Sequence, residues 1–282
     1  PWLLAWATDD EPSDHRRLKF DYGGVAQDPA DVVRQAAPWR AAARAAGRAI
    51  PIWTNHVGPH IYPDWARNNA LMQDYMRGPA SDWLSADSYP PQEGRPVVIR
   101  TADGYASTTQ GVILDRQRAW SGGKPAMAII GTSAFRPLLA VPTPEQFRAM
   151  AWSAVIHGAV GIVYFPVRLP PSWSFDATPP ALVQAVVAFD RRIASLQDVL
   201  VDAKVGGRRP YTLWRSANPG AAPTAGQLPY PFEASEIATP KGPFRIVLNL
   251  SDKPQTLDRP RWGLARANFR PYEARMAYGP RR

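Results

Sequence analysis

Three neighbouring acids, Asp9, Asp10 and Glu11, directly follow the apolar run 2–8 and end at Pro12. Adjacent carboxylates repel one another, which raises the pKa of at least one of them. A carboxyl whose pKa is raised in this way can act as a general acid near neutral pH. The alternative is a surface turn in which the acids only cap the segment that follows. The position of the triplet relative to other polar residues decides between the two.

Other apolar, strand-like runs also end in polar or aromatic residues. These runs are 49–56, 83–87, 125–130 and 159–165. The residues at or just beyond their ends are Asn55, His56, Asp87, Tyr89, Thr132, Ser133, Tyr164 and Phe165. The repeated placement suggests that all five ends belong to one edge of a sheet.

Helical patterns separate these runs, at 29–48, 63–76, 108–119, 143–157 and 180–201. The clearest helix start is Thr143-Pro144-Glu145, with an N-cap hydroxyl, a proline at the first position and an acid in the first turn. Continuous apolar strands that alternate with helices indicate a parallel sheet with covered faces. In such α/β folds the chemistry lies at the carboxyl ends of the strands. The acidic triplet therefore becomes a candidate site.

The pattern changes after about residue 205. Short alternating segments such as "FRIVLNLS" and "YEARMAYG" are broken by glycine, proline, asparagine and aspartate. This is typical of an antiparallel module, and we predict a small β-sandwich. The expected domains are 1–203 and 204–282.

Composition excludes several classes of protein. The chain has 282 residues, 45% of them hydrophobic, which is enough for a substantial core. It has no cysteine, which rules out disulfides, thiolate metal sites and thiol nucleophiles. The longest apolar run, 154–165, is shorter than the roughly 18 to 20 residues that a membrane helix needs, so no membrane role is predicted. The compartment cannot be read from the sequence, and a secreted or periplasmic location stays open.

The formal net charge of +9 does not by itself indicate a nucleic-acid partner. The arginines are scattered along the chain, whereas a nucleic-acid binder tends to gather them on one helix or stripe. We therefore expect no nucleic-acid binding. No glycine-rich phosphate loop follows a strand, and Ser133 is not part of a Gly-x-Ser-x-Gly elbow. The sequence predicts no cofactor and no metal.

Taken in order, the segments resemble a clan A glycoside hydrolase, a (β/α)8 barrel followed by a β-sandwich. "PWLLAWATDDEP" is similar to the family's strand-four pattern W…DEP, in which the Glu is the general acid/base. "IPIWTNH", "ASDWLSADSYP" and "GKPAMAIIG" are similar to strands five to seven. "PTPEQFRAMAWSAVIHGAVGIVYF" is similar to the segment from helix seven to strand eight, and "FRPYEARMAYG" to the last strand of the β-domain. The resemblance implies a barrel over 1–203 and a sandwich over 204–282.

Two departures from the family pattern have consequences. On this alignment the chain begins at strand four, and an incomplete barrel leaves sheet edges open, so we expect a fragment of a longer protein. The run 125–130 is followed by Gly131-Thr132-Ser133, where retaining members carry a nucleophilic Glu. The usual mechanism with two glutamates is therefore not predicted.

The resemblance implies that Glu11 is the general acid of glycoside cleavage. The reaction also needs a group that attacks or stabilises the anomeric carbon. Asp10 is one candidate, because an Asp-Glu pair resembles that of substrate-assisted hexosaminidases. Asp87 is the other, as a base or a stabilising group at the longer separation of an inverting mechanism. Both alternatives stay open.

Residues that contact sugar are expected at the same strand ends. Aromatic rings stack on sugar faces, although core packing is the alternative origin of each ring. For His56 the alternative is a buried, satisfied histidine, and His157 lies in an apolar helix and is expected to be structural. The predicted set is Asn55, His56, Tyr89, Thr132, Tyr164, Phe165 and Trp173. The sequence thus predicts a glycan hydrolase, and the rival prediction is a catalytically inactive barrel that binds carbohydrate.

Overall fold

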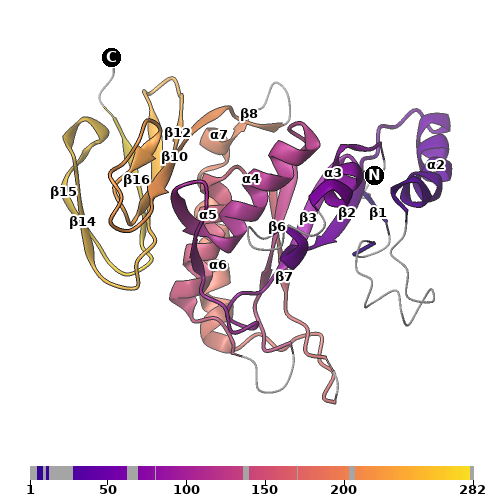
Figure 1. Cartoon of the computed structure of the whole chain (residues 1–282), viewed down its shortest axis with the longest axis horizontal. Helices are drawn as coiled ribbons and strands as arrows, with labels where there is room; N and C mark the ends of the chain where they lie inside the picture. The colour runs from indigo at the N-terminus through magenta and orange to yellow at the C-terminus, as the bar shows by residue number, and fades with distance from the viewer. Residues whose placement is uncertain are drawn as a thin grey trace. The chain divides into compact units, whose positions relative to one another are not determined.

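The computed structural model describes residues 5–8, 11–12, 28–61, 69–79, 81–135, 140–169, 171–202 and 207–279 (Figure 1). The chain divides into two compact units. The first comprises Pro1–Ser88 and Ile113–Ile129, and the second comprises Tyr89–Val112 and Ile130–Arg282.

Parallel strands and helices alternate in the first unit. Its elements are β1 (Trp6–Ala7), α2 (Pro29–Ala45), β2 (Ile52–Val57), the 3-10 turn η1 (Gly58–Ile61), α3 (Asn69–Arg77), β3 (Trp83–Ser88), most of α4 (Thr109–Ser121) and most of β6 (Ala126–Gly131). Parallel pairing joins Ala7 to Trp53, and Asn55 to Ser85. The parallel sheet has the strand order β1-β2-β3-β6-β7, with β7 at Gly161–Phe165, which is also the order along the chain.

Local sequence signals explain where the helices begin. The side chain of Asp28 accepts the backbone N–H of Ala30 at 2.8 Å, and Pro29 occupies the first helical position of α2. In α5 (Pro144–Ile156), Thr143 and Gln146 form a reciprocal capping box. Both helices therefore begin at caps that the sequence already contains.

The second unit holds a seven-stranded sheet that is mostly antiparallel. Its strands are β4 (Val98–Arg100), β5 (Tyr105–Thr108), β10 (Tyr211–Ala217), β11 (Gln227–Leu228), β12 (Phe232–Ile237), β13 (Phe244–Asn249) and β16 (Ala274–Tyr278). They run in the order β16-β13-β12-β10-β5-β4, with β11 beside β10. Helix α5 packs against β5, β12 and β13. The unit also contains β7 (Gly161–Phe165), α6 (Pro180–Ala194), α7 (Gln197–Leu200) and the pair β8 (Val201–Asp202) and β9 (Gly207–Arg208).

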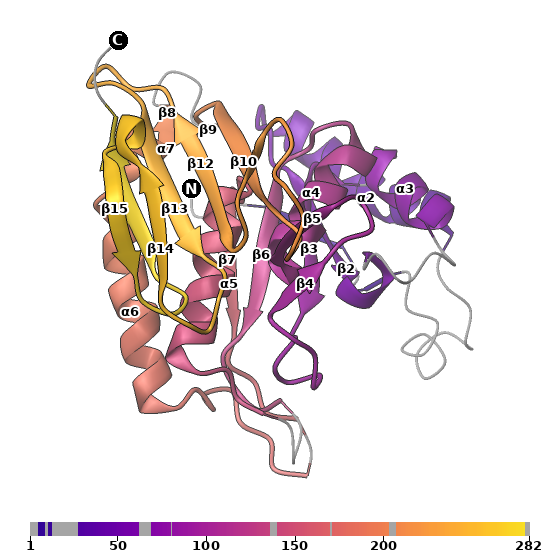
Figure 2. The same cartoon turned by 60° about the vertical axis from the view of Figure 1, so that its left-hand side comes forward.

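A hairpin of β14 (Gln255–Arg259) and β15 (Leu264–Phe269), joined by η3 (Pro260–Trp262), lies beside this sheet (Figure 2). Buried side chains of the hairpin, Leu257, Leu264 and Phe269, share one apolar cluster with Phe232 and Val247 of the sheet. The antiparallel module thus has a second layer, and burial of this cluster holds the two layers together.

The parallel strands and the antiparallel module agree with the mixed α/β fold that the sequence predicts. A full (β/α)8 barrel is not confirmed, because the described residues contribute five strands to the parallel sheet. Strands β4 and β5 were not predicted. Strand β5 pairs with β10, which lies about a hundred residues further along the chain, and a short local pattern cannot reveal such a pairing. The proposed domain boundary at 203/204 remains a prediction.

Candidate active site

A row of hydrogen-bonded polar side chains crosses β2 and β3 in the first unit. The indole Nε1 of Trp53 donates to Ser85 Oγ at 2.7 Å, and Ser85 Oγ donates to Asn55 Oδ1 at 2.7 Å. Alternate residues of a strand share a face, and in parallel register Asn55 lies opposite Ser85 while Val57 lies opposite Asp87. Asp87 therefore lies on the same face as this row, near the carboxyl end of β3.

Glu11 is placed at this edge by an unusual backbone. Its φ is 52°, in the left-handed region, which costs about 1–2 kcal/mol for a residue with a Cβ. Its N–H donates to the carbonyl oxygen of Asn55 at 3.1 Å. The hydroxyl of Tyr75 donates to the carbonyl of Pro12, the next residue, at 3.5 Å. Strain of this kind, held by specific partners, is typical of functional positions.

The turn after β2 packs closely on the backbone of Asp87. A Cβ added to Gly58 would lie 1.7 Å from the Asp87 carbonyl oxygen, so only glycine allows this approach. The end of β3 is thereby fixed against η1, and the Asp87 side chain is half-buried.

His56 lies on the opposite face of β2 from Asn55. Its fully buried ring packs against Tyr75 of α3, with ring centroids 6.2 Å apart. Trp6 of β1 stacks on Trp39 of α2, and Thr8 Oγ1 donates to Thr54 Oγ1 at 3.0 Å. This face is covered by helices, and the structure does not bring His56 to the polar row. Burial, together with the charge of Asp28, raises the pKa of Tyr75 to about 12.

In the second unit, aromatic rings gather beyond the ends of β6 and β7. Tyr89 stacks on Phe165 at 5.2 Å and lies 5.3 Å from Phe135, centroid to centroid. A Cβ on Gly131 would lie 2.3 Å from Nε2 of the buried Gln92 and 2.8 Å from Tyr89. Tyr89 is itself buried, at 7% exposure, so its ring packs inside the protein at the ends of these strands.

Tyr164 points away from that cluster, because adjacent residues of a strand face opposite sides. Its hydroxyl donates to Asp190 of α6 at 2.5 Å, and its ring packs on Phe147 of α5. Burial and the hydrogen bond to Asp190 raise the pKa of Tyr164 above its ordinary value of 10. Tyr164 thus joins β7 to the helices, and the structure does not bring it together with Phe165.

The segment after β6 carries hydroxyls where the family pattern has an acid. Thr132 Oγ1 donates to the Phe165 carbonyl at 3.3 Å and lies 2.8 Å from Thr178 Oγ1. Ser133 Oγ donates to the Val167 carbonyl at 2.7 Å. Both hydroxyls join the end of β6 to the segment after β7, and none of the residues 130–135 is acidic.

Trp173 is strongly exposed, at 59%, and has a partner that was not predicted. Phe175 is 77% exposed, and the two rings are stacked with centroids 6.0 Å apart. A bridge between Arg168 and Ser174 shapes this loop, which leads from β7 toward α6. The i, i+2 spacing of Trp173 and Phe175 was the available signal, because it places two side chains on the same side of extended chain.

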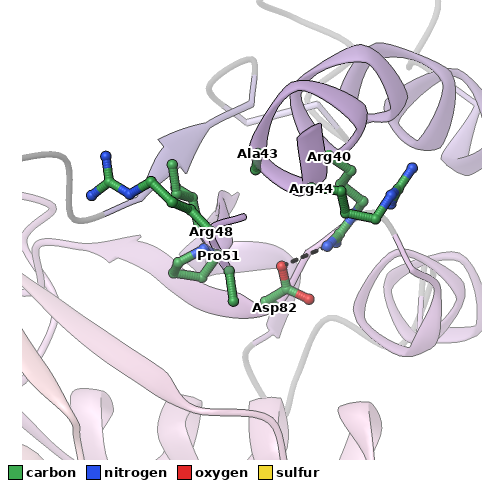
Figure 3. A pocket seen from close by; sticks show the side chains of 8 residues that line it. Arg40, Ala43, Arg44, Arg48, Pro51 and Asp82 are labelled. Carbon is green, nitrogen blue, oxygen red and sulfur yellow. Dashed lines mark hydrogen bonds and ion pairs between the residues drawn. The ribbon is translucent and has the colours of Figure 1, made fainter. Parts of the chain in front are cut away.

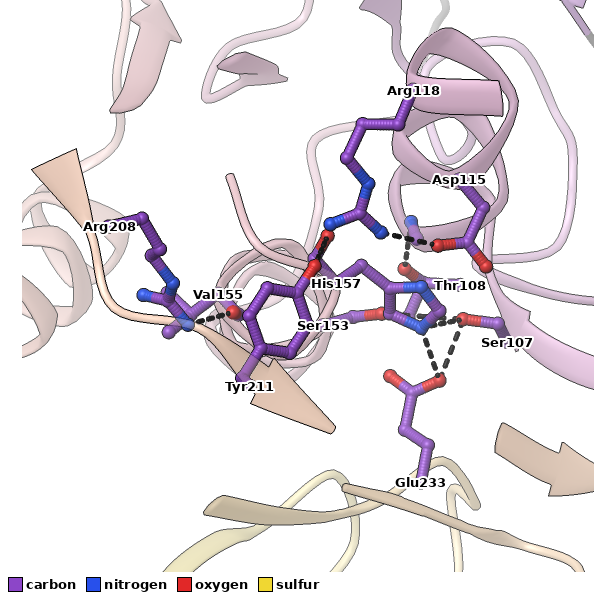
Figure 4. A network of polar contacts seen from close by, with 11 residues as sticks. Ser107, Thr108, Asp115, Arg118, Ser153, Val155, His157, Arg208, Tyr211 and Glu233 are labelled. Carbon is purple, nitrogen blue, oxygen red and sulfur yellow. Dashed lines mark hydrogen bonds and ion pairs between the residues drawn. The ribbon is translucent and has the colours of Figure 1, made fainter. Parts of the chain in front are cut away.

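A fully buried polar cluster in the second unit was also missed. Ser107 Oγ donates to Glu233 Oε2 at 2.7 Å, and Nε2 of His157 lies 3.0 Å from Ser107 Oγ and 3.1 Å from Glu233 Oε2 (Figure 4). A catalytic triad uses the two different ring nitrogens for its serine and its acid, whereas one nitrogen faces both groups in this cluster. The cluster joins α5 to the antiparallel sheet, which agrees with the structural role expected for His157.

Some predicted residues lie outside the described part of the chain. These are Asp9 and Asp10. Within the described ranges no cluster of three or more potential ligands suitable for a metal occurs. None of the described helices has the length and apolarity needed to span a bilayer.

Comparisons with known proteins add little to this geometry. No family model matches the chain, and no curated protein matches its sequence. A solved structure that matches is a cyclic α-maltosyl-(1→6)-maltose hydrolase from Arthrobacter globiformis, with 11% identity and a TM-score of 0.33. The match covers 83% of this chain and 57% of that one. At this level of likeness, function has to be argued from the chain's own residues.

Proposed function

We propose that the chain is part of a glycoside hydrolase that cleaves O-glycosidic bonds of a glycan, with Glu11 as the general acid/base. In this proposal the parallel sheet forms part of a (β/α)8 barrel. The proposal rests on the placement of Glu11. Its strained backbone is held by the Asn55 carbonyl at the carboxyl edge of the sheet, next to the row of Trp53, Ser85 and Asn55.

The proposed reaction begins with proton transfer. The Glu11 carboxyl gives its proton to the glycosidic oxygen as the bond from that oxygen to the anomeric carbon breaks. The oxygen of a water molecule bonds to the anomeric carbon, and the proton released by the water passes to a carboxylate. Asp87 is the candidate for this base, on the face that carries the polar row. In the alternative, Asp10 orients an N-acetyl group of the substrate, whose carbonyl oxygen bonds to the anomeric carbon as the leaving oxygen departs. Water then opens this intermediate, and its proton passes back to Glu11.

Recognition of the sugar is assigned to two groups of side chains, one in each unit. The amide of Asn55 is suited to sugar hydroxyls, because Ser85 fixes its orientation through Oδ1. The exposed pair Trp173 and Phe175 offers apolar ring faces on which a pyranose can stack.

A second candidate function is a carbohydrate-binding barrel without catalysis. The observation that favours it is the segment Gly131-Thr132-Ser133, which has hydroxyls bonded to backbone and no carboxylate after β6. A binding protein would keep the aromatic and amide contacts and would not need Glu11.

The test is a screen of aryl glycosides with the protein expressed from its full open reading frame. The Glu11→Gln variant is compared with a matched Glu145→Gln control in the exposed first turn of α5. The hydrolase proposal expects the Glu11→Gln change to lower kcat/KM by a factor of about 100 or more, with the control unchanged. Equal loss in both variants, or none in either, contradicts the assigned role. Binding of glycans by calorimetry without any hydrolysis favours the second candidate.

A further inference from the structure

A pocket of about 380 Å³ opens in the first unit beside the end of α2 (Figure 3). Its lining includes Pro51, just before β2, and Asp82, just before β3. The pocket thus lies at the amino ends of these strands, whereas Asn55 and Asp87 lie toward their carboxyl ends. Pro51 and Asn55 are four residues apart along β2, and Asp82 and Asp87 are five apart along β3, which is roughly 13–17 Å of strand, so the pocket is separate from the candidate active site.

One arginine of the pocket, Arg40, is already bonded to neighbouring residues. Arg40 Nη1 donates to Asp82 Oδ2 at 2.9 Å, and its Nη2 donates to the carbonyl of Pro79 at 2.8 Å. The same Asp82 oxygen accepts the backbone N–H of Ile52 at 2.8 Å. The acid of the pocket is therefore neutralised and fixed by its own neighbours, and the pair carries no net charge.

Two further arginines leave the pocket with an excess of positive charge. Arg44 and Arg48 are exposed, and neither forms an ion pair with any residue in the described part of the chain. Figure 3 shows Arg48 on one side of the pocket and Arg40 and Arg44 on the other, with the Asp82 carboxylate near the middle. A ligand that satisfies both free guanidinium groups has to carry acidic groups at two separated points.

The surface between these arginines is apolar. It is formed by the buried Ala43 and by Ala49, Ile50 and Pro51. The volume falls within the range of about 300–1,000 Å³ that is typical of small-molecule sites. Guanidinium groups bind carboxylate and phosphate with charge-assisted hydrogen bonds, and the apolar surface suits a carbon skeleton.

We propose that this pocket binds a small organic dianion whose two acidic groups face Arg44 and Arg48 and whose carbon body lies over Ile50 and Pro51. A single inorganic anion would contact either Arg44 or Arg48, but not both. Two classes of compound carry two acidic groups on an apolar skeleton, namely dicarboxylates and bisphosphates. The site does not depend on the proposed hydrolysis.

The experiment is a calorimetric titration of the purified protein at constant ionic strength. The probes are linear dicarboxylates of four to eight carbons, the corresponding monocarboxylates, alkane bisphosphates of the same lengths, and inorganic phosphate. The variants are Arg44→Gln and Arg48→Gln. The control is Arg191→Gln, because Arg191 stands in the last turn of α6 just as Arg44 stands in the last turn of α2.

The expected result is saturable binding of a dianion of one preferred length, at least tenfold tighter than the corresponding monocarboxylate. Arg44→Gln and Arg48→Gln should each remove this advantage, and Arg191→Gln should leave it intact. Comparison of the dicarboxylate and bisphosphate series identifies the source that the site prefers. Absence of saturable binding overturns the proposal, as does equal weakening by all three changes, which would indicate general attraction to a basic protein. Unchanged urea midpoints confirm that each variant is folded.

Discussion

The backbone N–H of Glu11 donates to the carbonyl oxygen of Asn55, and this bond ties the segment after β1 to β2. It also holds Glu11 in the left-handed region of backbone space. A glutamate in that region is destabilising by itself, whereas a glycine is not. Substitutions at position 11 can therefore distinguish the catalytic role of the glutamate side chain from the effect of its strained backbone on the free energy of unfolding.

Replacement of Glu11 tests this separation directly. We expect Glu11→Gly to be more stable than Glu11→Ala by about 1 kcal/mol, because only glycine adopts the left-handed backbone without strain. Urea denaturation of both variants measures the difference. Both should have lost hydrolytic activity. If the alanine variant is as stable as the glycine variant, the strain assigned to Glu11 is absent in solution.

Ser85 should matter for both stability and activity, because it connects Trp53 to Asn55. Ser85→Ala leaves the indole N–H and the amide oxygen without this partner, which should lower the free energy of unfolding by about 1–2 kcal/mol. Loss of the fixed Asn55 orientation should also raise KM. Ser195→Ala is the control, since Ser195 is exposed and its hydroxyl donates to the carbonyl of Arg192 in its own helix. If the steady-state kinetics of Ser85→Ala match those of the wild type, the row of Trp53, Ser85 and Asn55 is not part of the active site.

The sequence predicts where the strands end, but it does not predict which face of the sheet each side chain occupies. Asn55 and His56 both stand at the end of an apolar run, and period-two alternation requires that they face opposite sides. The sequence does not say which side the helices cover, so both entered the predicted set, as did Tyr164 and Phe165. The contact of His56 with Tyr75 and that of Tyr164 with Asp190 resolve the choice. Such contacts depend on tertiary packing, which a local pattern does not encode.

The buried cluster of Ser107, His157 and Glu233 should be a large contributor to stability. All three side chains are excluded from water, so removal of Glu233 takes a buried hydrogen-bond partner away from both Ser107 and His157. We expect Glu233→Ala to lower the free energy of unfolding by about 3–5 kcal/mol. Glu145→Ala, at an exposed acid paired with the partly exposed Arg148, should cost about 1 kcal/mol or less. Similar losses at the two positions, measured by urea denaturation, would contradict the role assigned to the cluster.

The exposed rings of Trp173 and Phe175 should affect substrate binding without affecting folding. Each ring lies largely in solvent, so Trp173→Ala and Phe175→Ala should change the free energy of unfolding by less than about 0.5 kcal/mol. Loss of a stacking surface should weaken glycan binding by a factor of about five or more. Tyr230→Ala, also at an exposed aromatic residue, is the matched control. Glycan affinity electrophoresis that shows equal retardation of all variants would exclude the pair from binding.

Glu273 should make the antiparallel module sensitive to acid. Burial by itself would raise the pKa of this carboxyl, but the backbone N–H of Arg270 and the guanidinium of Arg275 outweigh it and hold the pKa below its ordinary value of 4.5. The folded state therefore binds this proton less readily than the unfolded state does. The stabilisation is fully present above about pH 5 and is lost as the pH falls through the folded pKa.

Urea denaturation of the wild type and of Glu273→Gln between pH 7 and pH 3 measures this dependence. The difference in the free energy of unfolding should be largest at pH 5 to 7, where the carboxylate keeps its bonds to Arg270 and Arg275. It should shrink toward pH 3, because protonation of the wild-type carboxyl removes the charge that the variant already lacks. A difference that stays constant over the whole range would mean that the bonds to Glu273 do not depend on its charge.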